Sequence, residues 1–152
     1  MSRFEQSLAS PIGPLTLLAD QIGITGLEWR DGRKDGTPIL LQAAGQLTEY
    51  FAGKRQDFTV PIRLTCSDFQ RTVCAAMSAI PFGDTRTYGD LATQLGAPAQ
   101  AIGQACGGNP VAILIPCHRV LGATGLGGYS GDGGIETKVW LLRHEGAAGL
   151  LI

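Results

Sequence analysis

The first sixty residues alternate between short apolar runs and turn clusters, as the strands of a small sheet do. Three of these runs predict β-strands, at 4–8, 15–19 and 24–29. From residue 39 the period changes, because apolar side chains then recur at helical spacing as far as Phe51, and Gly53 is placed to end that helix. The pattern predicts a β-meander covered by one helix, followed by an extended linker at 59–64.

The second half of the chain carries a mainly helical pattern. Apolar stripes and capping residues predict helices from Ser67 to Ile80, over 88–95, over 98–106 and from Ile135 to Gly146. Thr87 can cap the second of these and Gly96 breaks it. Two short helices joined by a glycine turn are typical of a helix-turn-helix and equally of an ordinary αα-hairpin, and spacing alone leaves both open.

Chemistry concentrates at the end of the apolar run 111–115, which we interpret as a short buried strand. That run delivers Cys117 and His118 side by side at a turn. A cysteine is a strong nucleophile only as the thiolate, and a histidine is the side chain best suited to take its proton near neutral pH. A third group usually orients the histidine, and Glu145 is the candidate. A charge exposed at the end of a helix remains the alternative for Glu145.

Composition narrows the class of protein. The formal net charge is −1, with seven basic and seven acidic side chains in 1–64 and five and six in 65–152, so charge does not favour a nucleic-acid partner. No apolar run approaches the roughly 20 residues that a membrane span needs, and no signal peptide is evident. We therefore expect a cytoplasmic protein, or a nuclear one if the source has a nucleus, with no membrane partner.

The metal-binding and disulfide classes find little support. Cysteines stand at 66, 74, 106 and 117 without CxxC spacing, and the only histidines are at 118 and 144. We interpret the first three cysteines as buried and inert, and we expect no metal site.

The block NPVAILIPCHRV at 109–120 closely resembles the active-site segment of the O6-alkylguanine-DNA alkyltransferases, also called methylated-DNA–protein-cysteine methyltransferases. The resemblance spans roughly 69–146, and it is specific because the cysteine motif, the preceding Asn109-Pro110 and the closing His-Glu-Gly at 144–146 occur in order. Some members of that family carry an N-terminal zinc, but this chain has no Cys or His before Cys66.

The resemblance implies an α/β protein of two domains. Residues 1–64 would form a small sheet-plus-helix scaffold, and 65–152 would form a mostly helical domain with a helix-turn-helix and a short active-site strand. The implied activity is direct DNA repair, in which an alkyl group moves irreversibly from O6 of guanine to Cys117. The implied partner is double-stranded DNA with the damaged base flipped out of the stack. We expect a monomer that needs no cofactor.

The resemblance also assigns roles residue by residue. In the family a water links the histidine to the cysteine and a glutamate holds the histidine, roles that fall on His118 and Glu145. Asn109 would brace the turn that presents the cysteine, although turn chemistry alone also accounts for it. Tyr88 would donate a hydrogen bond as guanine leaves, with a core aromatic as the alternative. The remaining substrate contacts would come from Val120 and from Tyr129, Ser130 and Gly131 in the glycine-rich segment 122–134, a candidate lid or a plain connection.

The chain departs from the family on the expected DNA surface, which we assign to Thr87, Ala99, Gln100 and Arg119. Family members usually place an arginine in the second helix of the helix-turn-helix, where this chain has Gln100, and no Lys or Arg occurs between Thr87 and His118. We therefore expect weak DNA binding, with salt sensitivity confined to a few cationic sites, and for Arg119 a structural ion pair.

This departure keeps other functions open. The same cysteine could accept alkyl groups from a small molecule or a free nucleobase. A non-catalytic lesion-binding protein would lack the cysteine, so Cys117 argues against that class. A cysteine hydrolase would need a preformed oxyanion hole, to which nothing in the sequence points.

Overall fold

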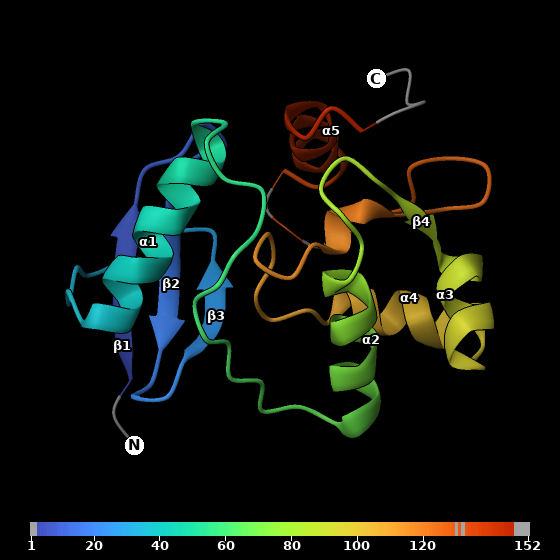
Figure 1. The fold of residues 1–152 in the computed structure, drawn as a ribbon, viewed down its shortest axis with the longest axis horizontal. Helices are drawn as coiled ribbons and strands as arrows, with labels where there is room; N and C mark the ends of the chain where they lie inside the picture. Colours follow the sequence, from blue (N-terminus) through green and yellow to red (C-terminus); the bar gives the residue numbers. More distant parts are fainter. Residues whose placement is uncertain (1–2, 130, 132, 148–152) are drawn as a thin grey trace. The chain divides into compact units, whose positions relative to one another are not determined.

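The computed structural model describes residues 3–129, 131 and 133–147, and the chain divides into two compact units, Met1–Thr65 and Cys66–Ile152 (Figure 1). The first unit holds a sheet with one helix, and the second is mostly helical. The predicted α/β class is confirmed. No helix within the described ranges is both long and apolar enough to span a membrane.

The first unit is built on a three-stranded antiparallel sheet in the order β1-β2-β3. Its strands are β1 (Phe4–Leu8), β2 (Leu15–Ala19) and β3 (Ile24–Glu28). Leu17 of the central strand lies opposite Gln6 on one side and Leu27 on the other. Leu15, Leu17 and Ala19 alternate along that strand and are buried, as the two-residue period of a strand requires.

Helix α1 (Pro38–Phe51) contributes the other side of this core. Thr37 caps its first turn by accepting a hydrogen bond from the Leu40 amide, and Pro38 occupies the first helical position, where no amide hydrogen is needed. Its buried face carries apolar side chains at helical spacing, namely Leu40, Ala43, Leu47 and Tyr50. The first unit is therefore a packed scaffold.

The segment predicted as a linker is extended but belongs to the first unit. The Ile24 amide donates to the Pro61 carbonyl at 2.8 Å, and the Arg63 amide donates to the Ile24 carbonyl at 2.8 Å. The buried Gln46 side chain accepts hydrogen bonds from the amides of Thr59 and Val60. These bonds fix the segment beside β3.

Helices dominate the second unit. They are α2 (Asp68–Ser78), α3 (Tyr88–Leu95), α4 (Ala99–Gly107) and α5 (Ile135–His144). Thr87 and Asp90 form a reciprocal capping box at the start of α3, and Gly96 ends that helix in the left-handed conformation, with φ +64°. Helix α4 packs against both α2 and α3. Local signals thus set both ends of α3, the first helix of the pair that the sequence predicted.

Two very short strands join the helix pair to the cysteine segment. Strand β4 (Arg86–Thr87) pairs in parallel with β5 (Val120–Leu121). Because Tyr88 directly follows β4 and the Cys117 turn directly precedes β5, this pairing ties Tyr88 and Cys117 to one small ribbon.

The prediction of a buried strand at 111–115 is wrong, because this segment is a compact turn. The Leu114 amide donates to the Ala112 carbonyl and the Ile115 amide to the Val111 carbonyl, both at 2.9 Å, while Ile113 has φ +74°. All five residues are buried. An uninterrupted apolar run indicates that a segment is buried on every side. Both a buried strand and a buried turn meet that condition, so the run alone could not distinguish them.

Asn109 closes this turn with its side chain. Its Nδ2 donates to the Ile115 carbonyl at 2.8 Å, and its Oδ1 accepts from the Val111 amide at 3.0 Å. The two bonds hold together a turn that contains a β-branched residue in the left-handed region, a conformation that costs roughly 1–2 kcal/mol. Asn109 therefore makes the hydrogen bonds that a bracing role requires.

Replacing the brace should loosen the turn. We expect Asn109→Ala to lower the free energy of unfolding by about 2 kcal/mol, because two hydrogen bonds of about 1 kcal/mol each are lost. Urea unfolding followed by circular dichroism measures this change. Gln104→Ala, at an exposed position of α4, should change it by less than about 0.5 kcal/mol. Equal effects of the two substitutions would contradict the bracing role.

Candidate active site

Cys117 opens a single turn of 3-10 helix, Cys117–Arg119, directly after the buried turn. The Cys117 amide donates to the Ile115 carbonyl at 2.8 Å, so the backbone reverses around Pro116. The chain thus turns sharply at Pro116-Cys117, yet in the described structure His118 Nδ1 makes no hydrogen bond to the thiol.

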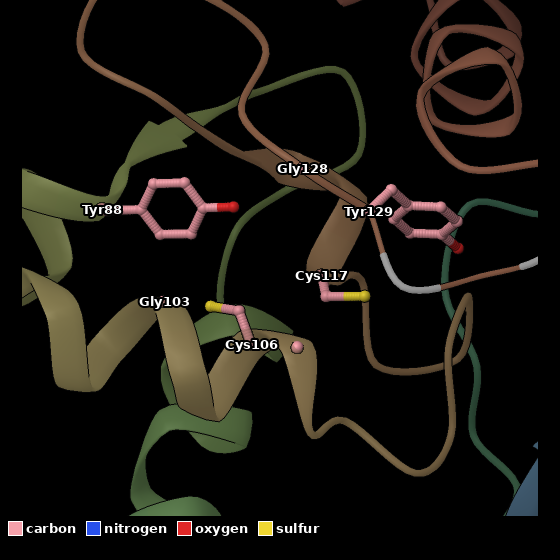
Figure 2. A pocket seen from close by; sticks show the side chains of 7 residues that line it. Tyr88, Gly103, Cys106, Cys117, Gly128 and Tyr129 are labelled. Atoms are coloured by element: carbon pink, nitrogen blue, oxygen red, sulfur yellow. The ribbon is translucent and has the colours of Figure 1, made fainter.

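The Cys117 side chain lines a cavity of about 390 Å³ (Figure 2). In Figure 2 the Tyr88 hydroxyl points from α3 toward the side of the cavity where Cys117 and Tyr129 lie. A cavity of this size lies in the range of small-molecule pockets. The other lining residues are Tyr88, Gly103, Cys106, Gly107, Gly128 and Tyr129.

The electrostatic environment of the Cys117 thiol is mixed. Burial raises the pKa of this thiol above its ordinary value, while a hydrogen bond from Asn109 and the charge on Lys138 act in the opposite direction. The thiolate therefore needs a base and a cation to form near neutral pH. The second thiol of the cavity, Cys106, has its pKa raised by burial to about 12, so it stays protonated.

His118, Glu145 and Arg119 form a buried group behind the cysteine. The His118 Nε2 lies 2.6 Å from Glu145 Oε2, and Arg119 donates to the same carboxylate from Nε at 2.8 Å and from its second terminal nitrogen at 3.1 Å. The third nitrogen of Arg119 donates to the Ile80 carbonyl at 2.7 Å. Glu145, the residue predicted to orient the histidine, is thus in contact with His118.

The charge states of this group follow from its contacts. Burial alone would raise the pKa of Glu145, but the hydrogen bonds and charges of His118 and Arg119 lower it to about 2, so the carboxylate is ionised. Burial lowers the pKa of His118, and Glu145 opposes this. A neutral His118 that donates from Nε2 has an unprotonated Nδ1. In the described part of the chain that Nδ1 has no hydrogen-bond partner, which leaves it free to accept a proton.

The assignment of Arg119 to a DNA surface does not fit this arrangement. Its side chain is only 7% exposed, and its guanidinium donates to Glu145 and Ile80. The sequence could not reveal this, because a buried arginine depends on a carboxylate 26 residues away along the chain. The ion pair expected of Arg119 is present.

The expected substrate contacts are only partly brought together. Tyr88 and Tyr129 line the cavity with Cys117. Val120 is fully buried and is not among the lining residues, and its carbonyl accepts a hydrogen bond from Lys138. Gly131 is buried and its carbonyl accepts from the Gly134 amide at 3.1 Å. Ser130 lies outside the described residues.

The expected DNA contacts on the helix pair lie at helix starts. Ala99 and Gln100 are exposed in the first turn of α4. Thr87 is half-buried, and its hydroxyl accepts from the Asp90 amide at 3.0 Å, so it is occupied as a cap. These three positions therefore offer hydrogen-bonding groups and a small side chain, and the exposed cation beside them is Arg86 of β4.

Sequence reasoning missed Lys138. The side chain is fully buried, and its Nζ donates to the carbonyls of Val120 at 2.7 Å and Gly128 at 2.9 Å. A signal was available, because Lys138 stands three and four residues before the buried Leu141 and Leu142 on α5 and so shares their face. Burial lowers the pKa of Lys138 to about 8.

A metal finds no ready-made site here. Over 3–129, 131 and 133–147, no three His, Cys, Asp or Glu side chains come together in a way that could hold an ion.

Removing the charge of Glu145 should destabilise the second unit. We expect Glu145→Gln to lower the free energy of unfolding at pH 7 by about 3 kcal/mol, because it leaves Arg119 buried without its counter-charge. The loss should shrink as the pH falls from 4.5, the ordinary pKa of a glutamate, toward about 2, because the wild-type carboxylate itself becomes protonated there. Urea unfolding at several pH values measures both.

Glu136→Gln is the matched control, because Glu136 is exposed in the first turn of α5, the helix that Glu145 directly follows. It should change the free energy of unfolding by less than about 0.5 kcal/mol. A Glu145→Gln variant as stable as this control would refute the central role of the carboxylate.

Known proteins resemble the chain over nearly all of its length. The family model described as the 6-O-methylguanine DNA methyltransferase ribonuclease-like domain matches residues 4–64, and the one described as the DNA binding domain of the same enzyme matches 68–147. A methylated-DNA–protein-cysteine methyltransferase of Mycobacterium tuberculosis is 44% identical, covering 92% of this chain and 90% of that protein. One from Methanosarcina acetivorans is 39% identical, covering 91% and 95%.

Solved structures agree with these relatives. The crystal structure of the Mycobacterium tuberculosis O6-methylguanine methyltransferase has a TM-score of 0.84 and 40% identity, covering 99% of this chain and 97% of that one. The structure of Mycobacterium tuberculosis OGT in complex with DNA has a TM-score of 0.82 and 42% identity, covering 93% and 92%. Together with the buried Cys117 site, these matches establish that the chain belongs to the 6-O-methylguanine DNA methyltransferase family.

Proposed function

We propose that this protein repairs O6-alkylguanine in DNA by moving the alkyl group to Cys117. The observation that carries the proposal is a cysteine on the wall of a cavity large enough for a nucleobase, next in sequence to a buried histidine whose Nδ1 has no hydrogen-bond partner in the described chain. The printed names of the relatives and the DNA complex of one of them support the same activity.

The proposed step is an in-line displacement. His118 Nδ1, which has no direct hydrogen bond to the thiol, takes the proton of Cys117 through a bridging water, while Glu145 holds the imidazole at Nε2. The thiolate attacks the alkyl carbon, a sulfur–carbon bond forms, and the carbon–O6 bond breaks. Guanine leaves as an anion and accepts a proton from Tyr88, whose hydroxyl points into the cavity, and the proton that His118 removed from Cys117 then restores the Tyr88 hydroxyl.

The product on the protein is a thioether. A thioether sulfur is a very poor leaving group, and no group in the cavity can displace it, so Cys117 reacts once. The protein is then a stoichiometric reagent whose capacity equals its concentration. Such repair takes place where the genome lies, in the cytoplasm or, in a eukaryote, the nucleus.

The reacting atom lies inside a duplex until the nucleotide is flipped out. The cavity is lined by α3, α4 and the Tyr129 segment, so we assign the approach of DNA to the helix pair. Gln100 and Ala99, exposed in the first turn of α4, are placed to meet the opened base stack. A glutamine can hydrogen-bond an orphaned base but brings no charge to the phosphates.

Intact-protein mass spectrometry with peptide mapping tests the activity. After mixing with a duplex that carries one O6-methylguanine, we expect one added methyl group, located on Cys117, and none with unmodified duplex. Cys117→Ser should accept no methyl group. Transfer from free O6-benzylguanine without transfer from the duplex would instead support an acceptor of alkyl groups from small molecules, and no transfer from either would overturn the proposal.

Because α4 carries no charged residue, adding a cation to it should strengthen DNA binding. We expect Gln100→Arg to tighten duplex binding several-fold and to steepen the dependence of log K on log salt by about 1, the increment for one added phosphate contact. Titration of labelled duplex at several salt concentrations measures both. Gln42→Arg, exposed on α1, adds the same charge elsewhere and should leave the slope unchanged. Equal slopes for the two variants would remove Gln100 from the DNA surface.

A further inference from the structure

The buried group behind Cys117 supplies a base but no net positive charge. Glu145 is ionised and Arg119 lies on both of its oxygens, so their charges cancel. Burial lowers the pKa of His118, which keeps the imidazole neutral. A thiolate in a buried site still needs a nearby cation. That cation therefore has to come from outside this group.

Lys138 meets the requirement because no carboxylate of the described residues contacts its ammonium. Its ammonium is fully buried, and within the described chain it donates to two backbone carbonyls, those of Val120 and Gly128, and to no carboxylate. Carbonyl oxygens satisfy the hydrogen-bonding capacity of an ammonium without cancelling its charge. A buried, uncompensated cation is costly to keep, and it acts strongly on titratable neighbours.

Four titratable side chains lie within electrostatic range of this ammonium. Cys117 and His118 come from the 3-10 turn, and Cys106 comes from the last turn of α4. The Tyr88 ring, from the start of α3, has its centroid 6.0 Å from Nζ. The charge of Lys138 lowers the pKa of both thiols, yet only Cys117 also receives the hydrogen bond from Asn109. Cys117 is therefore the group at which an anion is best stabilised.

The two carbonyls that accept hydrogen bonds from Lys138 belong to residues at the end of the Cys117 turn and on the cavity wall. Val120 directly follows the turn that presents Cys117, and Gly128 lines the cavity. One ammonium thus fastens the end of the cysteine turn and the glycine-rich segment to α5. The same contacts fix where its charge lies relative to the thiol.

We propose that Lys138 is the positioning residue that supplies the counter-charge for the Cys117 thiolate, held in place by the carbonyls of Val120 and Gly128. This deepens the proposed alkyl transfer and rests on it for its biological meaning. It divides the labour in the site, because His118 removes the proton and Lys138 stabilises the anion that remains.

The reactivity of Cys117 toward iodoacetamide tests this division without DNA or guanine. The thiolate sulfur attacks the methylene carbon, a sulfur–carbon bond forms, and iodide leaves. A Cys66→Ser background removes the cysteine that is only partly buried. Peptide mapping at a series of pH values between 5 and 10 then gives the rate at Cys117 alone, and the midpoint of that profile is the pKa of the thiol.

Lys138→Gln is the central variant, because an amide N–H can still donate to a backbone carbonyl while the charge is gone. We expect the midpoint to rise by about one pH unit or more, which slows alkylation about tenfold at pH 7, and the rates to converge at high pH. Lys138→Arg should restore the wild-type midpoint. Arg143→Gln, which removes an exposed cation from the same helix, should leave the profile unchanged.

Several results would overturn the proposal. One is a Lys138→Gln profile that overlays the wild type, and another is a rate lowered equally at every pH, which indicates a structural role alone. If Lys138→Gln does not fold by circular dichroism, Lys138→Met, an uncharged side chain of similar volume, takes its place under the same criteria. Failure of methyl transfer from DNA with a shifted iodoacetamide profile would refute the repair activity and leave the role of Lys138 standing.

Discussion

The carboxylate of Glu145 is the interaction on which the site depends. It follows α5 directly, and it receives the imidazole of His118 and the guanidinium of Arg119 from the turn that carries Cys117. Arg119 in turn donates to the Ile80 carbonyl beyond the end of α2. One ionised oxygen pair therefore fixes the orientation of the base and joins three segments that are distant in sequence. Removing any partner strands a charge or a polar group in the interior.

The parts of the fold that local chemistry decides could be read from the sequence. Thr37, Ser67 and Thr87 cap their helices as side chains of this kind do, and Gly53 and Gly96 take the positive φ that ends a helix. The adjacent cysteine and histidine, with a distant glutamate, were also legible, because that combination has a chemical purpose.

Features that depend on tertiary contacts could not be predicted from the sequence in the same way. The apolar run 111–115 shows burial, and only the side-chain brace of Asn109 with the backbone of Ile113 makes it a turn instead of a strand. Arg119 and Lys138 look like surface cations in one dimension. Each is buried because partners far along the chain, a carboxylate for one and two carbonyls for the other, make burial tolerable.

The left-handed Ile113 carries a consequence for how the nucleophile comes into being. A β-branched residue does not choose this conformation by itself, so the turn is imposed by the packing of the surrounding unit. A short peptide that spans the cysteine would then not retain this presentation of the thiol. The presentation of the Cys117 thiol is thus a property of the assembled unit.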